Sequence, residues 1–201
     1  LTYDSIGEEL LGLIASVRDR IFINYHRVLI EEFGRIKKFQ GEKYLKIYFY
    51  FQGGFANNGS HLLSLLFTHL ENIETINVFD QGGFVEDYSG CGSEKDSVTI
   101  DLFLIDVSEF NHSVWDVLIF SENFELRMLD GGKRLDLFEY DGAELKQGYK
   151  SRALSESIGI DIDGIFVKNF PKILNTDDSC SIDVELSINK FLKRVNYDKA
   201  S

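Results

Sequence analysis

The stretch Val98-Thr99-Ile100-Asp101-Leu102-Phe103-Leu104-Ile105 places aliphatic residues at its even positions and more polar or aromatic residues at most of its odd ones. Alternation with a period of two is typical of a β-strand that buries one face. Further apolar runs follow at residues 115–120 and 124–128, and Asp130-Gly131-Gly132 favours a hairpin turn into residues 135–140. We therefore predict a series of antiparallel strands after residue 97.

Helical spacing dominates the sequence before these strands. Ser5 is a candidate N-cap with Glu8 three residues later, and apolar residues recur at helical intervals up to Val28. This pattern predicts one long helix or two consecutive helices over residues 5–36. The remaining predictions are strands over 43–51 and 75–79, a second helix from Ser60, a last strand over 182–188, and a short helix after it.

Two identical tetrapeptides, Gln-Gly-Gly-Phe at residues 52–55 and 81–84, follow the strands predicted at 43–51 and 75–79. Two copies are too few for a repeat array, so we interpret them as turn chemistry used twice. The sequence thus predicts an α+β fold, with one or more N-terminal helices followed by a largely antiparallel sheet and helices on one face. Residues 1–201 form a single domain in this prediction, and an internal boundary near 82–93 is the alternative.

The charge of the chain is unevenly distributed. The whole sequence carries a formal charge of −12. Residues 51–144 hold 4 Lys or Arg against 18 Asp or Glu, a balance of 4 − 18 = −14. Such a segment is a poor candidate for binding nucleic acid, because phosphate contacts require basic side chains. With no apolar run long enough to cross a bilayer and no leader-like start, we expect a cytoplasmic protein with no membrane partner.

Catalytic and cofactor motifs are absent from the sequence. His61 and His69 are eight residues apart, whereas zinc ligands on a helix prefer a spacing of three or four. No nucleophile elbow and no glycine-rich dinucleotide or phosphate loop occurs. Cys91 lies among acidic residues that oppose thiolate formation, and we interpret it and Cys180 as reduced. We therefore predict no metal and no cofactor.

The acidic side chains between residues 101 and 144 are the candidate site. Several alternate with core positions, so a shared sheet face or its loops would attract a cationic partner. The predicted partner-binding residues are Asp101, Asp106, Glu109, Asp116, Glu122, Glu125, Asp130, Asp136, Glu139 and Asp141.

In size, acidity, lack of catalytic motifs and α+β pattern, the chain resembles bacterial immunity proteins of contact-dependent growth-inhibition systems. The resemblance implies a non-enzymatic binding protein that covers the active site of a basic, nuclease-type toxin domain. Two alternatives stay open: a hydrolase that combines dispersed carboxylates with His26, His61 or His112, and a structural subunit or adaptor whose partner need not be basic.

Overall fold

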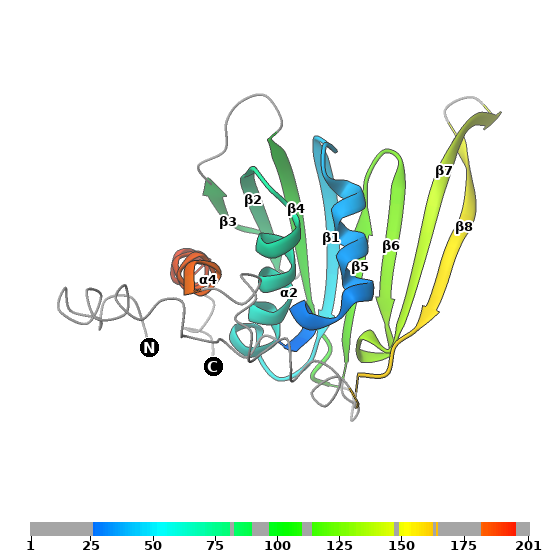
Figure 1. The fold of residues 1–201 in the computed structure, drawn as a ribbon. Helices are drawn as coiled ribbons and strands as arrows, with labels where there is room; N and C mark the ends of the chain where they lie inside the picture. Colours follow the sequence, from blue (N-terminus) through cyan, green and yellow to red (C-terminus); the bar gives the residue numbers. More distant parts are fainter. Residues whose placement is uncertain are drawn as a thin grey trace.

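The fold is seen in a computed structural model, which describes residues 26–80, 83–89, 97–109, 114–146, 149–162, 164 and 182–195. Its centre is an eight-stranded sheet in the order β3-β2-β4-β1-β5-β6-β7-β8 (Figure 1). The strands are β1 (Tyr44–Phe51), β2 (Ile73–Asp80), β3 (Gly83–Ser89), β4 (Val98–Asp106), β5 (Trp115–Phe120), β6 (Phe124–Leu129), β7 (Arg134–Lys146) and β8 (Tyr149–Gly159).

The sheet is mixed. Strands β2, β4 and β1 run parallel to one another, with β4 between the other two. Strand β3 pairs antiparallel with β2 at one edge, while β5 to β8 form an antiparallel meander on the other side of β1. Strand β1 is therefore the place where the parallel part of the sheet meets the antiparallel part.

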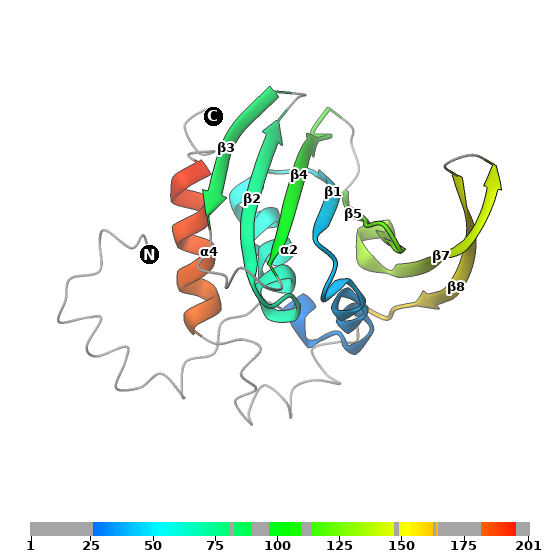
Figure 2. The same cartoon turned by 90° about the horizontal axis from the view of Figure 1, so that it is seen from above.

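The described helices lie along one face of this sheet, as Figure 2 shows from above. They are η3 (His26–Leu29), η4 (Glu31–Phe39), α2 (Phe55–His69) and α4 (Ile182–Val195). The short turn η5 (Asp130–Gly132) instead links β6 to β7. No described helix is long and apolar enough to cross a membrane.

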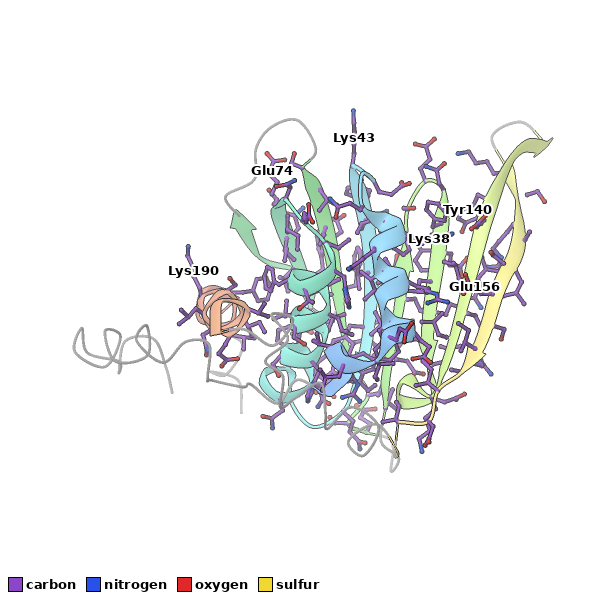
Figure 3. The ribbon with its side chains drawn as sticks, viewed as in Figure 1. Lys38, Lys43, Glu74, Tyr140, Glu156 and Lys190 are labelled. Carbon is purple, nitrogen blue, oxygen red and sulfur yellow. The ribbon has the colours of Figure 1, made fainter. Side chains whose placement is uncertain are left out.

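Aromatic rings hold the helices to the sheet. Phe49 and Phe51 of β1 stack at 5.1 Å, and both contact Phe55 in the first turn of α2, at 6.3 and 5.8 Å. On the other side, Phe39 of η4 packs edge-on against Phe124 at 6.0 Å. Lys38 of η4 also reaches Glu139 of β7 at 3.1 Å, and Arg35 reaches Glu156 of β8 at the same distance. Figure 3 labels Lys38 on η4 and Glu156 on β8. Helix η4 is thus tied to the meander and α2 to the parallel strands.

The predicted fold class is wrong. Helix α2 lies between β1 and β2 in the chain, and β4 pairs in parallel with both strands instead of starting an antiparallel meander. A parallel connection needs a crossover, and α2 makes that crossover from β1 to β2, so a helix lies between strands of the sheet rather than before all of them.

Individual elements fare differently. The strands predicted at 43–51 and 75–79 are confirmed as β1 and β2. Residues 182–188 form the first half of helix α4, not a strand. The repeated tetrapeptide serves two purposes, since Phe55 begins a helix whereas Gly83-Phe84 begins strand β3. The helical stretch predicted over residues 5–36 is described only from residue 26, where it forms η3 and η4. Its residues 5–25 lie outside the described residues, as do Cys91 and Cys180.

Gly59 provides the first test of this packing. It is buried in α2, and a side-chain carbon there would overlap the Phe55 ring, whose place against β1 is fixed. We expect Gly59→Ala to lower the free energy of unfolding by about 1–3 kcal/mol, because the steric strain exceeds the ~1 kcal/mol gain in helix propensity. Urea denaturation measures this change.

Gly34→Ala is the matched control, because a side-chain carbon at Gly34 of η4 meets nothing within 4 Å. This variant should be as stable as the wild type or more so. Equal effects of the two substitutions would contradict the packing described for Gly59.

His69, the last residue of α2, has a largely buried side chain and provides a second test of the packing. Neither ring nitrogen has a hydrogen-bond partner among the described residues. Burial, with a smaller contribution from Lys37, lowers the pKa of His69 to about 4. Since the unfolded chain has the ordinary value of about 6.5, the unfolded state binds this proton first.

The contribution of His69 to stability is therefore present above about pH 6.5 and is lost as the pH falls toward 4. We expect His69→Leu to reduce the loss of stability between these pH values, because leucine cannot take up the proton. Urea unfolding of both proteins at pH 7.5 and 4.5 measures the difference. An identical pH dependence in the two proteins would show that His69 is not the group responsible.

Candidate functional site

The carboxyl ends of the three parallel strands meet at one edge of the sheet. Strands β1, β2 and β4 end there at Phe51, Asp80 and Asp106. In open sheets with parallel strands, ligands bind outside this edge, at the point where the chain leaves neighbouring strands in opposite directions. From the end of β1 the chain turns into α2 toward β2, whereas from β4 it crosses to β5 on the other side of β1. The end of β1 is such a point.

Two glycines form the turn between β1 and α2. Gly53 and Gly54 have φ angles of 84° and 91°, a region that strongly favours glycine. The side-chain amide of Asn58 donates to the carbonyl oxygens of Gln52, at 2.7 Å, and Gly54, at 3.3 Å. The amide N–H of Gly53 donates to the Ser108 hydroxyl at 3.4 Å, which joins the turn to the chain leaving β4. These contacts fix the start of α2 relative to both strands.

An arginine and a tryptophan support this turn from the side. The Trp115 indole N–H donates to the Asn58 carbonyl oxygen at 3.2 Å. The Arg27 guanidinium lies 4.1 Å from the centre of the Trp115 ring and donates to the Gly131 carbonyl oxygen at 3.5 Å. Burial lowers the pKa of Arg27 to about 10, which leaves it charged at neutral pH. This cation therefore lies close to the end of β1.

A carboxylate lies on the other side of the same glycine. Asp116 of β5 accepts the Gly131 amide N–H at 3.0 Å. Burial raises the pKa of Asp116, although this hydrogen bond opposes the shift. Strand pairing places Asp116 beside Tyr50, one residue before the end of β1.

His61 brings an imidazole to the second turn of α2. It is half-buried and is followed by the fully buried Leu62 and Leu63. Asn57, four residues earlier and exposed, lies on the same side of the helix as His61. An imidazole can donate or accept a proton near neutral pH, and a neighbouring amide can orient a hydroxyl or carbonyl group. This pair suits proton transfer on a bound alcohol or ketone.

The site does not fit a dinucleotide. The phosphate loop of dinucleotide-binding domains requires Gly-x-Gly-x-x-Gly, whereas the turn here reads Gly53-Gly54-Phe55, with the next glycine at 59. The acid that holds the ribose follows the strand adjacent to this loop. Here the strand adjacent to β1 is β4, which ends at Asp106, whereas Asp80 at the end of β2 lies two strand spacings, about 10 Å, from the end of β1. The β1–α2 turn therefore lacks the glycine spacing that a dinucleotide-binding loop requires.

The predicted acidic residues are dispersed over the molecule. Asp101, Asp116, Glu125 and Asp136 lie on the sheet face opposite the helices, whereas Glu139 points to η4, where it pairs with Lys38. Asp106 and Glu109 follow the end of β4, Asp130 lies in η5, and Glu122 lies in the β5–β6 turn at the other end of the sheet. The side chain of Asp141 lies outside the described residues.

Several of these acids are paired within the chain. Glu125 is fully buried and accepts hydrogen bonds from Arg127, Arg152 and Tyr140, at 2.5, 2.8 and 3.1 Å. Burial works to raise the pKa of Glu125, but these three donors outweigh it and hold the pKa below its usual range. Asp136 likewise pairs with Arg134 at 3.3 Å and accepts the Ser157 hydroxyl.

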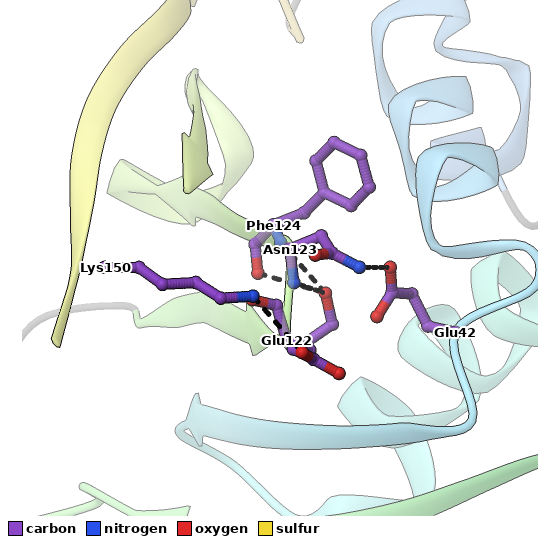
Figure 4. Close-up of polar contacts among 6 residues, drawn as sticks. Glu42, Glu122, Asn123, Phe124 and Lys150 are labelled. Carbon is purple, nitrogen blue, oxygen red and sulfur yellow. Dashed lines mark hydrogen bonds and ion pairs between the residues drawn. The ribbon is translucent and has the colours of Figure 1, made fainter. Parts of the chain in front are cut away.

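Polar residues also gather at the opposite end of the sheet. The Asn123 amide donates to Glu42 at 2.8 Å, and Lys150 reaches Glu122 at 3.2 Å (Figure 4). An open hollow of about 590 Å³ lies between this turn and the start of β1. The hydrogen bond to Glu42 and the ion pair with Lys150 fix the β5–β6 turn in place. The hollow lies at the opposite end of the sheet from the carboxyl ends of the parallel strands.

Sequence reasoning named His61 but missed the turn that begins its helix. The helix was predicted to begin at Ser60, where the leucine spacing starts, so the Gly53-Gly54 turn, Asn57 and Asn58 were not connected to it. A left-handed glycine pair directly after a strand is the signal that could have found them. The side chains of His26 and His112 lie outside the described residues, and the part that is described holds no group of three metal-ligating side chains.

Comparison with known proteins identifies the fold. No protein-family model and no curated protein matches the sequence. Among solved structures, the chain is similar to a candidate oxidoreductase from Magnetospirillum magnetotacticum, with a TM-score of 0.55, 12% identity, and coverage of 94% of this chain and 68% of that one.

Two enzymes have the same degree of similarity, each with a TM-score of 0.53 and 12% identity. The UDP-N-acetylglucosamine 3-dehydrogenase GnnA from Acidithiobacillus ferrooxidans matches over 94% of this chain and 66% of its own. KijD10, a 3-ketoreductase from Actinomadura kijaniata in complex with TDP-benzene and NADP, matches over 92% and 64%. The chain thus spans about two thirds of the length of these structures.

These similarities contradict the predicted function. An immunity protein that neutralises a toxin was inferred from acidity and the lack of motifs, whereas the fold is one found in dehydrogenases and reductases. The acidic segment also fails to form one surface, because its members divide between both faces and both ends of the sheet. The inference was wrong because charge along a sequence does not specify charge on a face.

The β1–α2 turn gives a test of the site geometry. Asn58→Ala removes the two amide hydrogen bonds to Gln52 and Gly54, and we expect it to lower the free energy of unfolding by about 1–2 kcal/mol. Asn57→Ala is the control, since Asn57 is exposed and its described hydrogen bond, from Ser60, uses the backbone carbonyl. Thermal and urea unfolding compare the two variants. A stronger effect at Asn57 than at Asn58 would refute this assignment of the turn contacts.

Proposed function

We propose that this chain forms the substrate-binding part of an oxidoreductase that acts on a sugar alcohol or ketone group, with a site outside the end of β1. The observation that carries the proposal is His61 in the second turn of α2, the helix that begins directly after the glycine turn at the end of β1, in a fold found in dehydrogenases and reductases. Asn57, Asn58 and Trp115 surround the same helix start.

The role of His61 in this proposal is proton transfer. Oxidation of an alcohol requires removal of the hydroxyl proton as a hydride leaves the carbon, and reduction of a ketone requires the reverse. A nicotinamide cofactor would supply the hydride chemistry, and it would be held outside the β1–α2 turn, which lacks the glycine pattern of a dinucleotide-binding loop. His61 would hold or release the proton at the reacting oxygen, because an imidazole exchanges protons near pH 7. Asn57 would orient that oxygen.

The proposed substrate class is a nucleotide-linked sugar. GnnA is a dehydrogenase of UDP-N-acetylglucosamine, and KijD10 was solved with a TDP compound. The Arg27 guanidinium lies near the end of β1, and its positive charge suits the attraction of a diphosphate.

The test measures turnover by the native protein. UDP- and TDP-linked sugars are offered with NAD or NADP, and the absorbance of the reduced nicotinamide is followed. We expect His61→Gln to lower kcat by about 10²- to 10⁴-fold with a smaller change in KM, because the proton acceptor is lost while the binding groups remain.

His69→Gln is the matched control. It makes the same substitution eight residues further along α2, where the imidazole is buried against η4, and it should leave kcat unchanged. Wild-type kcat in His61→Gln would remove His61 from the mechanism. Absence of binding of every nucleotide sugar, measured by calorimetry, would contradict the proposed substrate class.

A further inference from the structure

A fully buried carboxylate lies on the side of β6 that no described helix covers (Figure 2). Glu125 and Arg127 are two residues apart in β6, so both side chains project from the sheet face opposite the helices. Glu125 is nevertheless 0% exposed. The side chains that cover it come from the same face: Arg127 itself, Phe138 and Tyr140 of β7, and Arg152 of β8.

Two arginines share this carboxylate. The Nε of Arg127 donates to one oxygen of Glu125 at 2.5 Å, and the Nη1 of Arg152 donates to the other oxygen at 2.8 Å. The guanidinium carbons also lie over one aromatic ring, 4.8 and 4.5 Å from the centre of Phe138. The carboxylate and the ring therefore hold the two guanidinium groups side by side.

Both arginines keep hydrogen-bonding capacity. Each guanidinium uses a single nitrogen on Glu125, and the remaining nitrogens of Arg127 and Arg152 have no acceptor among the residues that the structure describes. The two side chains are 31% and 43% exposed. Because one carboxylate balances only one of the two guanidinium groups, the cluster keeps a net charge of about +1.

The carboxylate opposite Arg127 in the strand pairing does not cancel this charge. Asp136 of β7 is bound instead by Arg134, at 3.3 Å, and by the Ser157 hydroxyl, at 2.6 Å. The negative charge of Asp136 is thus balanced by an arginine outside the Glu125 cluster.

We propose that Arg127 and Arg152 form a binding site for the phosphate group of a small phosphate ester. A guanidinium presents paired N–H donors that match phosphate oxygens, and two adjacent guanidinium groups suit a ligand with more oxygens than a carboxylate has. Leu154 pairs with Phe138 on the same face and is 56% exposed. It offers an apolar contact to the organic part of the ester.

The charge of the whole chain makes fixed donors necessary for such a site. With a formal charge of −12, the protein repels anions at long range. Phosphate binding then depends on guanidinium groups already held in place by Glu125, rather than on a broadly positive surface. The site lies on the sheet face opposite α2 and His61, so the proposal does not depend on the proposed function.

The test measures binding of two probes, inorganic phosphate and phenyl phosphate, to the native protein by titration calorimetry at constant ionic strength. We expect saturable binding of both, and tighter binding of phenyl phosphate because its ring can contact Leu154. Arg152→Gln should raise both dissociation constants at least about tenfold, since charge-assisted hydrogen bonds to phosphate are lost. Arg152→Lys should also weaken binding, because an ammonium group keeps the charge but lacks the paired donors.

Arg35→Gln is the matched control. Arg35 of η4 also pairs with a glutamate, Glu156 at 3.1 Å, and is 37% exposed, but it lies on the helix side of the sheet. This variant should bind both probes as tightly as the wild type.

Circular dichroism checks that each variant is folded. If Arg152→Gln proves unfolded, Arg152→Lys decides the question, because it keeps a cation beside Glu125. A wild-type protein that binds neither probe would overturn the proposal and leave the cluster a purely structural link between β6 and β8. Phosphate binding that the folded Arg152 variant leaves unchanged, or that Arg35→Gln weakens equally, would overturn it as well.

Discussion

Two parallel strands cannot be joined by a tight turn, and the pairing of β1 with β4 therefore determines how the rest of the chain must run. The chain leaves β1 through α2, enters β2 two positions away, turns through β3, and returns to fill the place between β2 and β1. From β4 the chain crosses to the other edge of β1, where β5 pairs and the antiparallel meander follows. The position of the candidate site outside β1 and the exposure of the opposite sheet face both follow from this order.

The strength of the local signals decided how much of the fold the sequence could predict. Strands β1, β2 and β4 to β7 were located because alternation and glycine turns are encoded within a few residues. Their order in the sheet was not, because parallel pairing joins residues more than fifty positions apart, such as Tyr48 and Phe103. The first half of helix α4 was mistaken for a strand because Ile182, Val184, Leu186 and Ile188 alternate, whereas Val184, Ile188, Phe191 and Leu192 fit the helical repeat that the structure adopts.

The candidate site was predictable only in part, for a similar reason. His61 was visible as one of few imidazoles, but the start of its helix is fixed by contacts of Gly53, Asn58 and Trp115, which come together through the fold. The acidic residues illustrate the reverse case. The number of acidic residues was obvious in the sequence, yet Glu125 is neutralised by Arg127 and Arg152. Arg152 is 27 residues away along the chain and comes close to Glu125 only through the β7–β8 hairpin. A count of charges could not anticipate this pairing.

The contact between Gly59 and Phe55 limits how this site can change. Since the ring occupies the space that any side chain at position 59 would need, the first two turns of α2 have a single arrangement against β1. In the proposed enzyme, variation in substrate preference would come from side chains that project from this segment, such as Asn57 and Ser60, and from the chain that follows β4. A library built to alter specificity should hold positions 55 and 59 constant and randomise those surrounding His61.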